Sequence, residues 1–271
     1  MPLVLVCCVG PLSAQYVPFD IADITWTLGP DHPTYRKGGA LGFVGGMVVS
    51  AAGVEYPWAE SSETYGYAPG AAGWVALPSM PMGVAYTDGI TVGDSMYVVG
   101  GRTGVVNTRS EVFRLRKIGG SYVWDQQPSL SLTRAYHTLA LNGTRIIAGP
   151  GARFTNNNPP DWWDRMTTDV DSFDTANPGA GWSLIPSISG VPRIHPVTAA
   201  AGGRIYVFGG TNFGAPGSGY DTDRLNDAWV LQPGASSWTR LPDLPFGFAG
   251  GDAVTYRDRY IIMLGGVTEI S

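Results

Sequence analysis

Short apolar runs separated by turn residues recur along most of the chain. The clearest are the runs 96–101, 204–210 and 260–266, each of which ends in a glycine pair. Runs of this length that are rich in Val, Ile and aromatic residues and stop at glycine predict buried β-strands, since a helix needs a longer stretch with a 3.6-residue period. The pattern therefore predicts an all-β protein.

Further strands are expected on both sides of each run. Before it lies a stretch of small apolar residues that ends in a tight hairpin turn, as at Gly93-Asp94, Asn142-Gly143 and Gly202-Gly203. After the glycine pair comes a strand that carries an aromatic residue, in 64–67, 111–115, 170–173 and 227–231. A glycine-rich turn then leads to a tryptophan, so each unit is expected to contain four strands.

Five tryptophans mark the period of this unit. They are separated by 48, 50, 58 and 56 residues: Trp26, Trp74, Trp124, Trp182 and Trp238. Complete units run over about 37–81, 84–131, 134–189 and 193–245. Four-stranded sheets repeated in phase predict a β-propeller, whose sheets are arranged radially. The alternative, a β-sandwich with accidental spacing, does not explain so many coincident periods.

The glycine pair after the second strand, together with the spaced aromatic residue and tryptophan, resembles the kelch repeat. The resemblance covers about residues 24–266, with degenerate pairs at Ala52-Gly53 and around Pro150. It implies a kelch-type β-propeller with four complete blades. A fifth blade is expected from both termini, with strands in 250–266 and a strand at 24–28 around Trp26. Kelch propellers usually have six or seven blades, so the ring is expected to be either truncated or unusually small.

The N-terminus has the pattern of a signal peptide. An apolar run over 3–10 is followed by Pro11 and by a small residue, Ala14, which suits cleavage before Gln15. We therefore expect a signal peptide at 1–14, a propeller domain at 15–271, and a secreted or periplasmic protein. The alternative is a buried first strand. Both cysteines, Cys7 and Cys8, fall inside this segment, so the mature domain would contain no thiolate site.

Composition and charge exclude several classes of protein. The formal net charge is −5 and there is no Lys/Arg-rich run, which argues against nucleic-acid binding. No stretch of 18 apolar residues occurs, so no transmembrane helix is predicted. We expect a monomer that binds a glycan or an extracellular protein.

Two long loops after second strands, 152–168 and 211–226, belong to neighbouring blades and are expected to form one wall of a ligand site. The first carries a tryptophan pair with amide and carboxylate groups, a combination that suits sugar stacking. The candidates are Asn156, Trp162, Trp163 and Asp164 from the first loop, and Asn212, Tyr220 and Arg224 from the second. The alternative is that the tryptophan rings fold back and cap the blade.

Arginines recur at equivalent positions of the units. Arg134 and Arg193 open a first strand, with Lys37 roughly equivalent, whereas Arg102 and Arg153 follow the glycine pair. Such residues can bind a carboxylate through two parallel hydrogen bonds. The alternative is that they bridge blades as structural ion pairs, which is common in kelch repeats.

The histidines and acids indicate no metal or cofactor. His137 and His195 lie near the starts of first strands, where a structural role is expected, and His32 is isolated. The Asp residues lack the spacing of a calcium loop. We therefore predict neither a metal ion nor a cofactor.

Two functions remain open at this stage. The first is a binding module without chemistry. The second is a sugar mutarotase, because the chain resembles secreted bacterial N-acetylneuraminate epimerases, in which a glutamate after the second strand acts as general base. The corresponding positions here carry Arg102, Ala152 and Thr211, and Glu55 is the only acid near such a position. A galactose-oxidase-like activity is excluded for a mature domain without cysteine.

Overall fold

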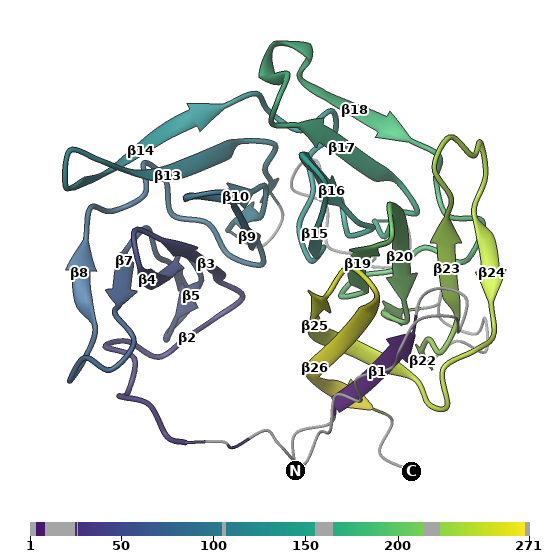
Figure 1. The fold of residues 1–271 in the computed structure, drawn as a ribbon, viewed down its shortest axis with the longest axis horizontal. Coiled ribbons are helices and arrows are strands. Elements are labelled where there is room, and N and C mark those ends of the chain that lie inside the picture. Colours follow the sequence, from purple (N-terminus) through teal and green to yellow (C-terminus); the bar gives the residue numbers. More distant parts are fainter. Residues whose placement is uncertain are drawn as a thin grey trace.

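The computed structural model describes residues 4–8, 25, 27–104, 107–154, 165–213 and 223–268. In this part of the chain the protein consists of antiparallel β-sheets arranged around a centre (Figure 1). No helix in the described part is long and apolar enough to cross a bilayer. The prediction of an all-β propeller is confirmed.

Four sheets have four strands each, in the sequential order predicted from the repeat. Blade 1 contains β3 (Ala40–Val44), β4 (Met47–Ala51), β7 (Thr64–Tyr67) and β8 (Val75–Leu77). Blade 2 contains β9 (Asp88–Val92), β10 (Ser95–Val99), β13 (Val112–Ile118) and β14 (Ser121–Gln127). Blade 3 contains β15 (Leu139–Asn142), β16 (Arg145–Ala148), β17 (Val170–Asp174) and β18 (Trp182–Ile185), with a short 3₁₀ helix, η3 (Pro178–Ala180), before β18. Blade 4 contains β19 (Val197–Ala201), β20 (Arg204–Phe208), β23 (Ala228–Leu231) and β24 (Thr239–Leu241).

The fifth blade combines both ends of the chain, but with a different N-terminal strand from the one predicted. β25 (Phe248–Tyr256) pairs with β26 (Tyr260–Thr268), and β26 pairs with β1 (Val4–Cys8) in the third position. The strand expected at 24–28 is wrong for the described residues there, which form no strand, and Leu28 is fully exposed. The N-terminal strand that joins this blade is instead β1, which takes the third place beside β26.

The pairing of β1 corresponds to the alternative of a first strand in the N-terminal segment. The pairing of β1 with β26 does not test cleavage after Ala14, so the signal peptide at 1–14 stays a prediction. Figure 1 shows blades 1 and 5 on either side of a sector that contains no described sheet. The number of blades in a complete ring also stays open.

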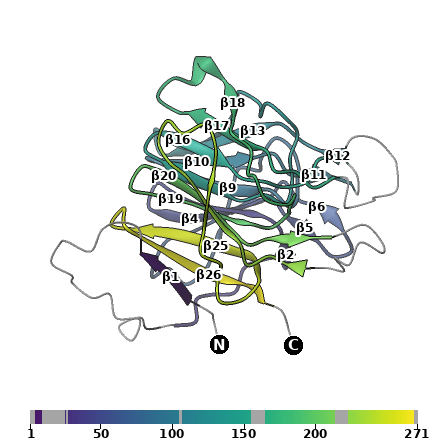
Figure 2. The ribbon, with the colours of Figure 1, turned by 90° about the vertical axis from the view of Figure 1, so that its right-hand side faces the viewer.

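Short ladders extend the loops that follow the second strands. They are β2 (Arg36–Lys37) with β5 (Val54–Glu55) and β6 (Ala59–Glu60), β11 (Arg102–Thr103) with β12 (Asn107–Thr108), and β21 (Thr211–Asn212) with β22 (Asp223–Arg224). Figure 2 shows β5, β6, β11 and β12 on the same side of the ring. The described ladders of the loops in blades 1 and 2 therefore lie on one face, while the shared wall expected from loops 152–168 and 211–226 stays a prediction, because much of both loops lies outside the described residues.

The hydrophobic core lies between neighbouring blades rather than within one blade. One cluster joins Ala40 and Val49 of blade 1 to Met96 and Leu115 of blade 2, and similar clusters join each later pair of blades. The inner strands β3, β9, β15, β19 and β25 contact one another in that order. Small residues on these strands allow the close approach that an inner position requires, as at Gly89, where an added Cβ would lie 2.6 Å from the Leu41 carbonyl oxygen.

Three phased tryptophans form hydrogen bonds to the preceding unit of the repeat. The indole Nε1 of Trp124 donates to the Pro78 carbonyl at 2.9 Å, and that of Trp238 donates to Pro186 at 2.6 Å. Trp74 makes the same bond to Pro30 at 3.3 Å. Each acceptor is the proline four residues after the preceding phased tryptophan. The repeat thus encodes a contact between blades as well as a strand.

The glycine pairs are required where one blade touches the next. Gly209 has φ +50°, and an added Cβ there would lie 2.2 Å from the carbonyl oxygen of Phe248 in blade 5. In the degenerate pair of blade 1, Ala52 keeps the same left-handed backbone, with φ 62°. The backbone conformation of the repeat is therefore retained even where its glycine is lost.

Candidate functional site

Aromatic residues at one position of the repeat line the centre of the ring. Tyr86, Tyr136 and His195 each precede an inner strand and have positive φ angles of 52°, 60° and 52°. The Tyr136 N–H donates to the Tyr86 carbonyl at 2.8 Å and the His195 N–H donates to the Tyr136 carbonyl at 2.7 Å. Gly250 continues this series by donating to His195 at 3.0 Å. These backbone bonds bring the three rings together from three blades.

The three rings pack against one another. Tyr86 and Tyr136 stack with centroids 4.3 Å apart, and His195 meets Tyr136 edge to face at 5.2 Å. They form part of the wall of a cavity of about 310 Å³ at the centre of the ring, together with Asp88 and Asp252. A cavity of this size is at the lower end of the range for small-molecule sites, which fits a monosaccharide.

Arg102 and Glu60 add charge beside the tyrosines. The Arg102 guanidinium lies 4.7 Å from the centroid of the Tyr86 ring, and its Nη1 lies 3.6 Å from the Glu60 carboxylate, which β6 of blade 1 supplies. Nη1 also donates to the Gly104 carbonyl, whereas Nε is buried and has no hydrogen-bond partner among the described residues. The side chain of Arg102 is 12% exposed and that of Glu60 is 18% exposed. Both groups therefore combine partial shielding with access from the loop-bearing face.

Burial sets the protonation of the ring residues. It raises the pKa of Tyr136 to about 12, so the phenol keeps its proton at neutral pH. Burial, assisted by the positive charge of Arg224, lowers the pKa of His195 to about 4, so its imidazole is neutral. The site therefore offers a carboxylate, a guanidinium, a phenol donor and a neutral imidazole close together.

Asp88 is a further unusual group of the central cavity. Its Oδ2 accepts the Leu139 N–H of the next blade at 2.7 Å, and its Oδ1 accepts the Gly89 N–H at 2.7 Å. Burial, followed by the like charge of Asp252, raises the pKa of Asp88 to about 8. His137, also on this cavity, is buried and has a pKa lowered to about 3 by burial.

Arg134 and Arg193 lie inside the protein, as expected if they have a structural role. Both side chains are fully buried. Arg193 donates two hydrogen bonds, of 2.6 and 2.8 Å, to the Asp227 carboxylate. It also donates to the Gly209 carbonyl at 2.8 Å. Arg134 donates to the carbonyls of Ala148 and Gly149 at 2.7 and 2.6 Å. These donors hold the ends of second strands.

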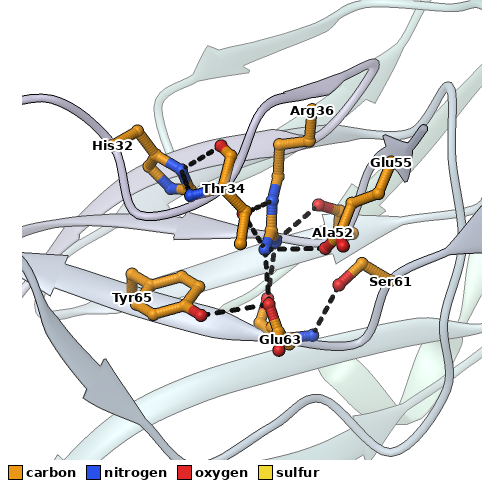
Figure 3. A network of polar contacts seen from close by, with 8 residues as sticks. All are labelled: His32, Thr34, Arg36, Ala52, Glu55, Ser61, Glu63 and Tyr65. Carbon is orange, nitrogen blue, oxygen red and sulfur yellow. Dashed lines mark hydrogen bonds and ion pairs between the residues drawn. The ribbon is translucent and has the colours of Figure 1, made fainter.

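In blade 1 the corresponding residue is Arg36, not Lys37 as predicted. Figure 3 shows the Arg36 guanidinium between the carboxylates of Glu55 and Glu63, at 3.1 and 2.9 Å. It also donates to the Ala52 carbonyl at 3.0 Å, as its counterparts do to their own second strands. The Lys37 ammonium instead lies 4.3 Å from the Trp58 ring centroid. Glu55, the acid expected nearest the position of a general base, is thus engaged in this network.

Three of the remaining candidates have described contacts, and five lie outside the described residues. Asn212 donates to the Pro192 carbonyl at 2.6 Å. The positive charge of Arg224 acts on His195 and, after burial, helps to lower its pKa. Arg153 forms an ion pair with Asp169 at 2.9 Å. Four candidates lie outside the described residues: Asn156, Trp162, Trp163 and Asp164. Tyr220 lies outside them as well.

Reasoning from the sequence missed Glu60, Tyr86 and Tyr136. The repeated Ala-Tyr before two inner strands, at 85–86 and 135–136, was the available signal for the tyrosines. Glu60 had no such signal, because it reaches Arg102 across the junction between two blades. In the described part of the chain, no three His, Cys, Asp or Glu side chains converge as a metal site would require.

Comparisons with known proteins agree with this architecture. Residues 192–245 match the family model described as the Kelch motif. An N-acetylneuraminate epimerase from Yersinia enterocolitica is 33% identical over 148 residues, which cover 54% of this chain and 34% of that protein. Proteins of the same name from Haemophilus influenzae and Yersinia pestis are 33% identical over 96 residues and 34% identical over 100 residues. These matches cover 35% and 36% of this chain, and 24% and 25% of the relatives.

The fold is also that of a solved structure. The structure of YjhT matches with a TM-score of 0.66 at 14% identity, over 86% of this chain and 81% of that chain. The curated relatives are matched over about a third of their length or less, so their activity is not transferred by the alignment alone. By its repeat, its sheets and these matches, the chain is a kelch-type β-propeller with distant similarity to N-acetylneuraminate epimerases.

Proposed function

We propose that this protein binds an acidic monosaccharide of the sialic acid type at the mouth of the central cavity and interconverts its anomers. The observation that carries the proposal is the convergence of Glu60, Arg102, Tyr86, Tyr136 and His195 from four blades. The similarity to N-acetylneuraminate epimerases supports the same substrate class. Location in the periplasm or outside the cell, expected from the N-terminal segment, remains part of the proposal.

Each group has a defined task in such a site. Arg102 binds the sugar carboxylate, because its guanidinium matches the two oxygens of a carboxylate and its Nε has no partner in the described part of the chain. The edge of the stacked tyrosines supplies the apolar surface for a sugar ring. The neutral His195 adds a hydrogen-bonding group without a competing charge.

The chemistry is a reversible ring opening. Glu60 removes the proton from the anomeric hydroxyl, the bond from the anomeric carbon to the ring oxygen breaks, and the ring oxygen takes a proton from the Tyr136 phenol. Ring closure on the other face of the carbonyl reverses these transfers and returns both protons. General acid–base catalysis of this kind contributes about 10²- to 10⁴-fold to a rate.

The rate at which the anomers of N-acetylneuraminate interconvert, measured by NMR exchange spectroscopy, tests the proposal. We expect Glu60→Gln to lower the exchange rate by about 100-fold, since the amide cannot accept the proton. Arg102→Gln is expected to weaken substrate binding. The matched control is Glu55→Gln, in the same β5–β6 hairpin but held by Arg36, and it is expected to retain the activity.

The second candidate function is recognition of an acidic sugar without chemistry. The stack of Tyr86 on Tyr136 under Arg102 supplies an apolar surface and a positive charge, the two features that binding of an acidic sugar needs. Saturable binding of N-acetylneuraminate by the wild type without faster anomer exchange would favour this function. Equal exchange rates for the wild type and Glu60→Gln would rule out the proposed base.

A further inference from the structure

Two arginines face each other at the neck of the loop that follows β16. Ala152 and Met166 form an antiparallel bridge, and the Arg153 N–H donates to the Arg165 carbonyl at 2.8 Å. Arg153 and Arg165 are therefore directly opposed. Opposed residues of an antiparallel pair project from the same face with Cβ atoms about 5 Å apart, where like charges destabilise the pair. Such a pair requires a compensating negative charge.

The described surroundings compensate only part of this charge. Asp169 pairs with Arg153 at 2.9 Å, and Asp171 lies 3.8 Å from the buried guanidinium of Arg134. Arg165 makes no ion pair in the described part of the chain, and its Nε is buried without a hydrogen-bond partner. Among the described residues, three arginines therefore face two carboxylates, which leaves one positive charge without a described partner.

A cavity lies beside the two arginines. It has a volume of about 530 Å³ and is bounded by the neck of the loop and by the link after β14, which contributes Ser131 and Thr133. Thr167 also lines it, and this residue is only 7% exposed. Its Oγ1 is buried and has no partner in the described residues. A buried hydroxyl without a partner is unfavourable, and a bound ligand that accepts its hydrogen bond removes this cost.

We propose that this cavity is a binding site for a small oxyanion, such as sulfate, or for the oxyanion group of a larger ligand. The guanidinium groups of Arg153 and Arg165 hold two oxygens of the anion, and the Thr167 hydroxyl donates to a third. Guanidinium groups suit this task because their parallel N–H groups match the spacing of oxyanion oxygens. The site shares no lining residue with the central cavity, so it is independent of the proposed function.

Calorimetric titration of the full chain with sodium sulfate tests the site, with sodium chloride at equal ionic strength as the reference. We expect saturable binding of sulfate, weakened at least tenfold in Arg165→Gln and in Arg153→Gln. Arg165→Lys keeps the positive charge but loses the paired N–H donors of the guanidinium. This variant is therefore expected to bind sulfate with intermediate affinity. The matched control is Arg145→Gln in the same blade, because the Arg145 side chain is 54% exposed and, among the described residues, forms its ion pair with Asp174.

Two comparisons make the result decisive. In the Arg102→Gln variant, which lacks the arginine proposed for the central site, tighter binding of a sulfated or carboxylated monosaccharide than of sulfate would identify the anion as part of a sugar, and equal binding would identify a free anion. Arg102→Gln is expected to keep sulfate binding, which separates this site from the central one. Binding that does not saturate, or that is unchanged in both Arg153→Gln and Arg165→Gln, would overturn the proposal.

Discussion

Single residues show how the repeat uses charge inside a blade. Arg36, Arg134 and Arg193 occupy one position of three blades, and each donates to carbonyls at the end of its own second strand. Arg193 adds a two-point ion pair with Asp227, and hydrogen bonds from Arg193 and Trp229 keep the pKa of Asp227 below its ordinary value although burial opposes this. The sequence thus predicted the arginines of blades 3 and 4 but not Arg36 of blade 1, and only the structure gives the partners of all three.

We expect Arg193→Met to destabilise the protein by about 3 kcal/mol, because it leaves a largely buried carboxylate without its cation. Arg240→Met, at an exposed pair with Asp243, is expected to cost less than about 0.5 kcal/mol. Urea unfolding of both variants measures the difference. Similar midpoints would show that the buried pair contributes no more than a surface pair.

At the scale of strands, the phased tryptophans carry information that the strand pattern alone lacks. Trp238 is buried and donates to Pro186 in the preceding blade, whereas the buried Nε1 of Trp182 has no hydrogen-bond partner in the described part of the chain. The two residues therefore share a position and a shape but differ in one bond between blades.

This difference gives a matched pair of variants. Trp238→Phe loses both ring volume and a hydrogen bond and leaves the Pro186 carbonyl unpaired, while Trp182→Phe loses only ring volume. We expect Trp238→Phe to cost about 1 kcal/mol more than Trp182→Phe in thermal or urea unfolding. The same loss in both variants would mean that the tryptophans act by packing alone.

At the scale of the whole molecule, acidic groups from blades 2 and 5 meet in the central cavity. The folded pKa of Asp88, about 8, lies above the ordinary value of 3.8, so the folded protein binds more protons than the unfolded chain between these values. The stability that this group contributes is complete below about pH 4 and is lost as pH rises through about 8.

Asp252→Asn is expected to reduce this pH dependence, because it removes the like charge that helps to raise the pKa of Asp88. The amide oxygen can still accept the Ala253 N–H that Asp252 accepts at 2.7 Å. The melting temperature of the variant should fall less between pH 6 and 9 than that of the wild type. Asp243→Asn serves as the surface control, and equal slopes in all three proteins would contradict the coupling across the cavity.

The sequence by itself determined the strands, the four-stranded unit and its kelch-like repeat. These features depend on local properties, namely apolar runs, glycines with left-handed backbone and tryptophans in phase. It also identified Arg102 and Arg153 as residues of interest. The tertiary structure alone decided which N-terminal strand joins the fifth blade, that Glu60 contacts Arg102, and that Arg165 lies opposite Arg153. Contacts between blades and across loop necks join residues far apart in the repeat, and their geometry depends on packing that no local pattern records.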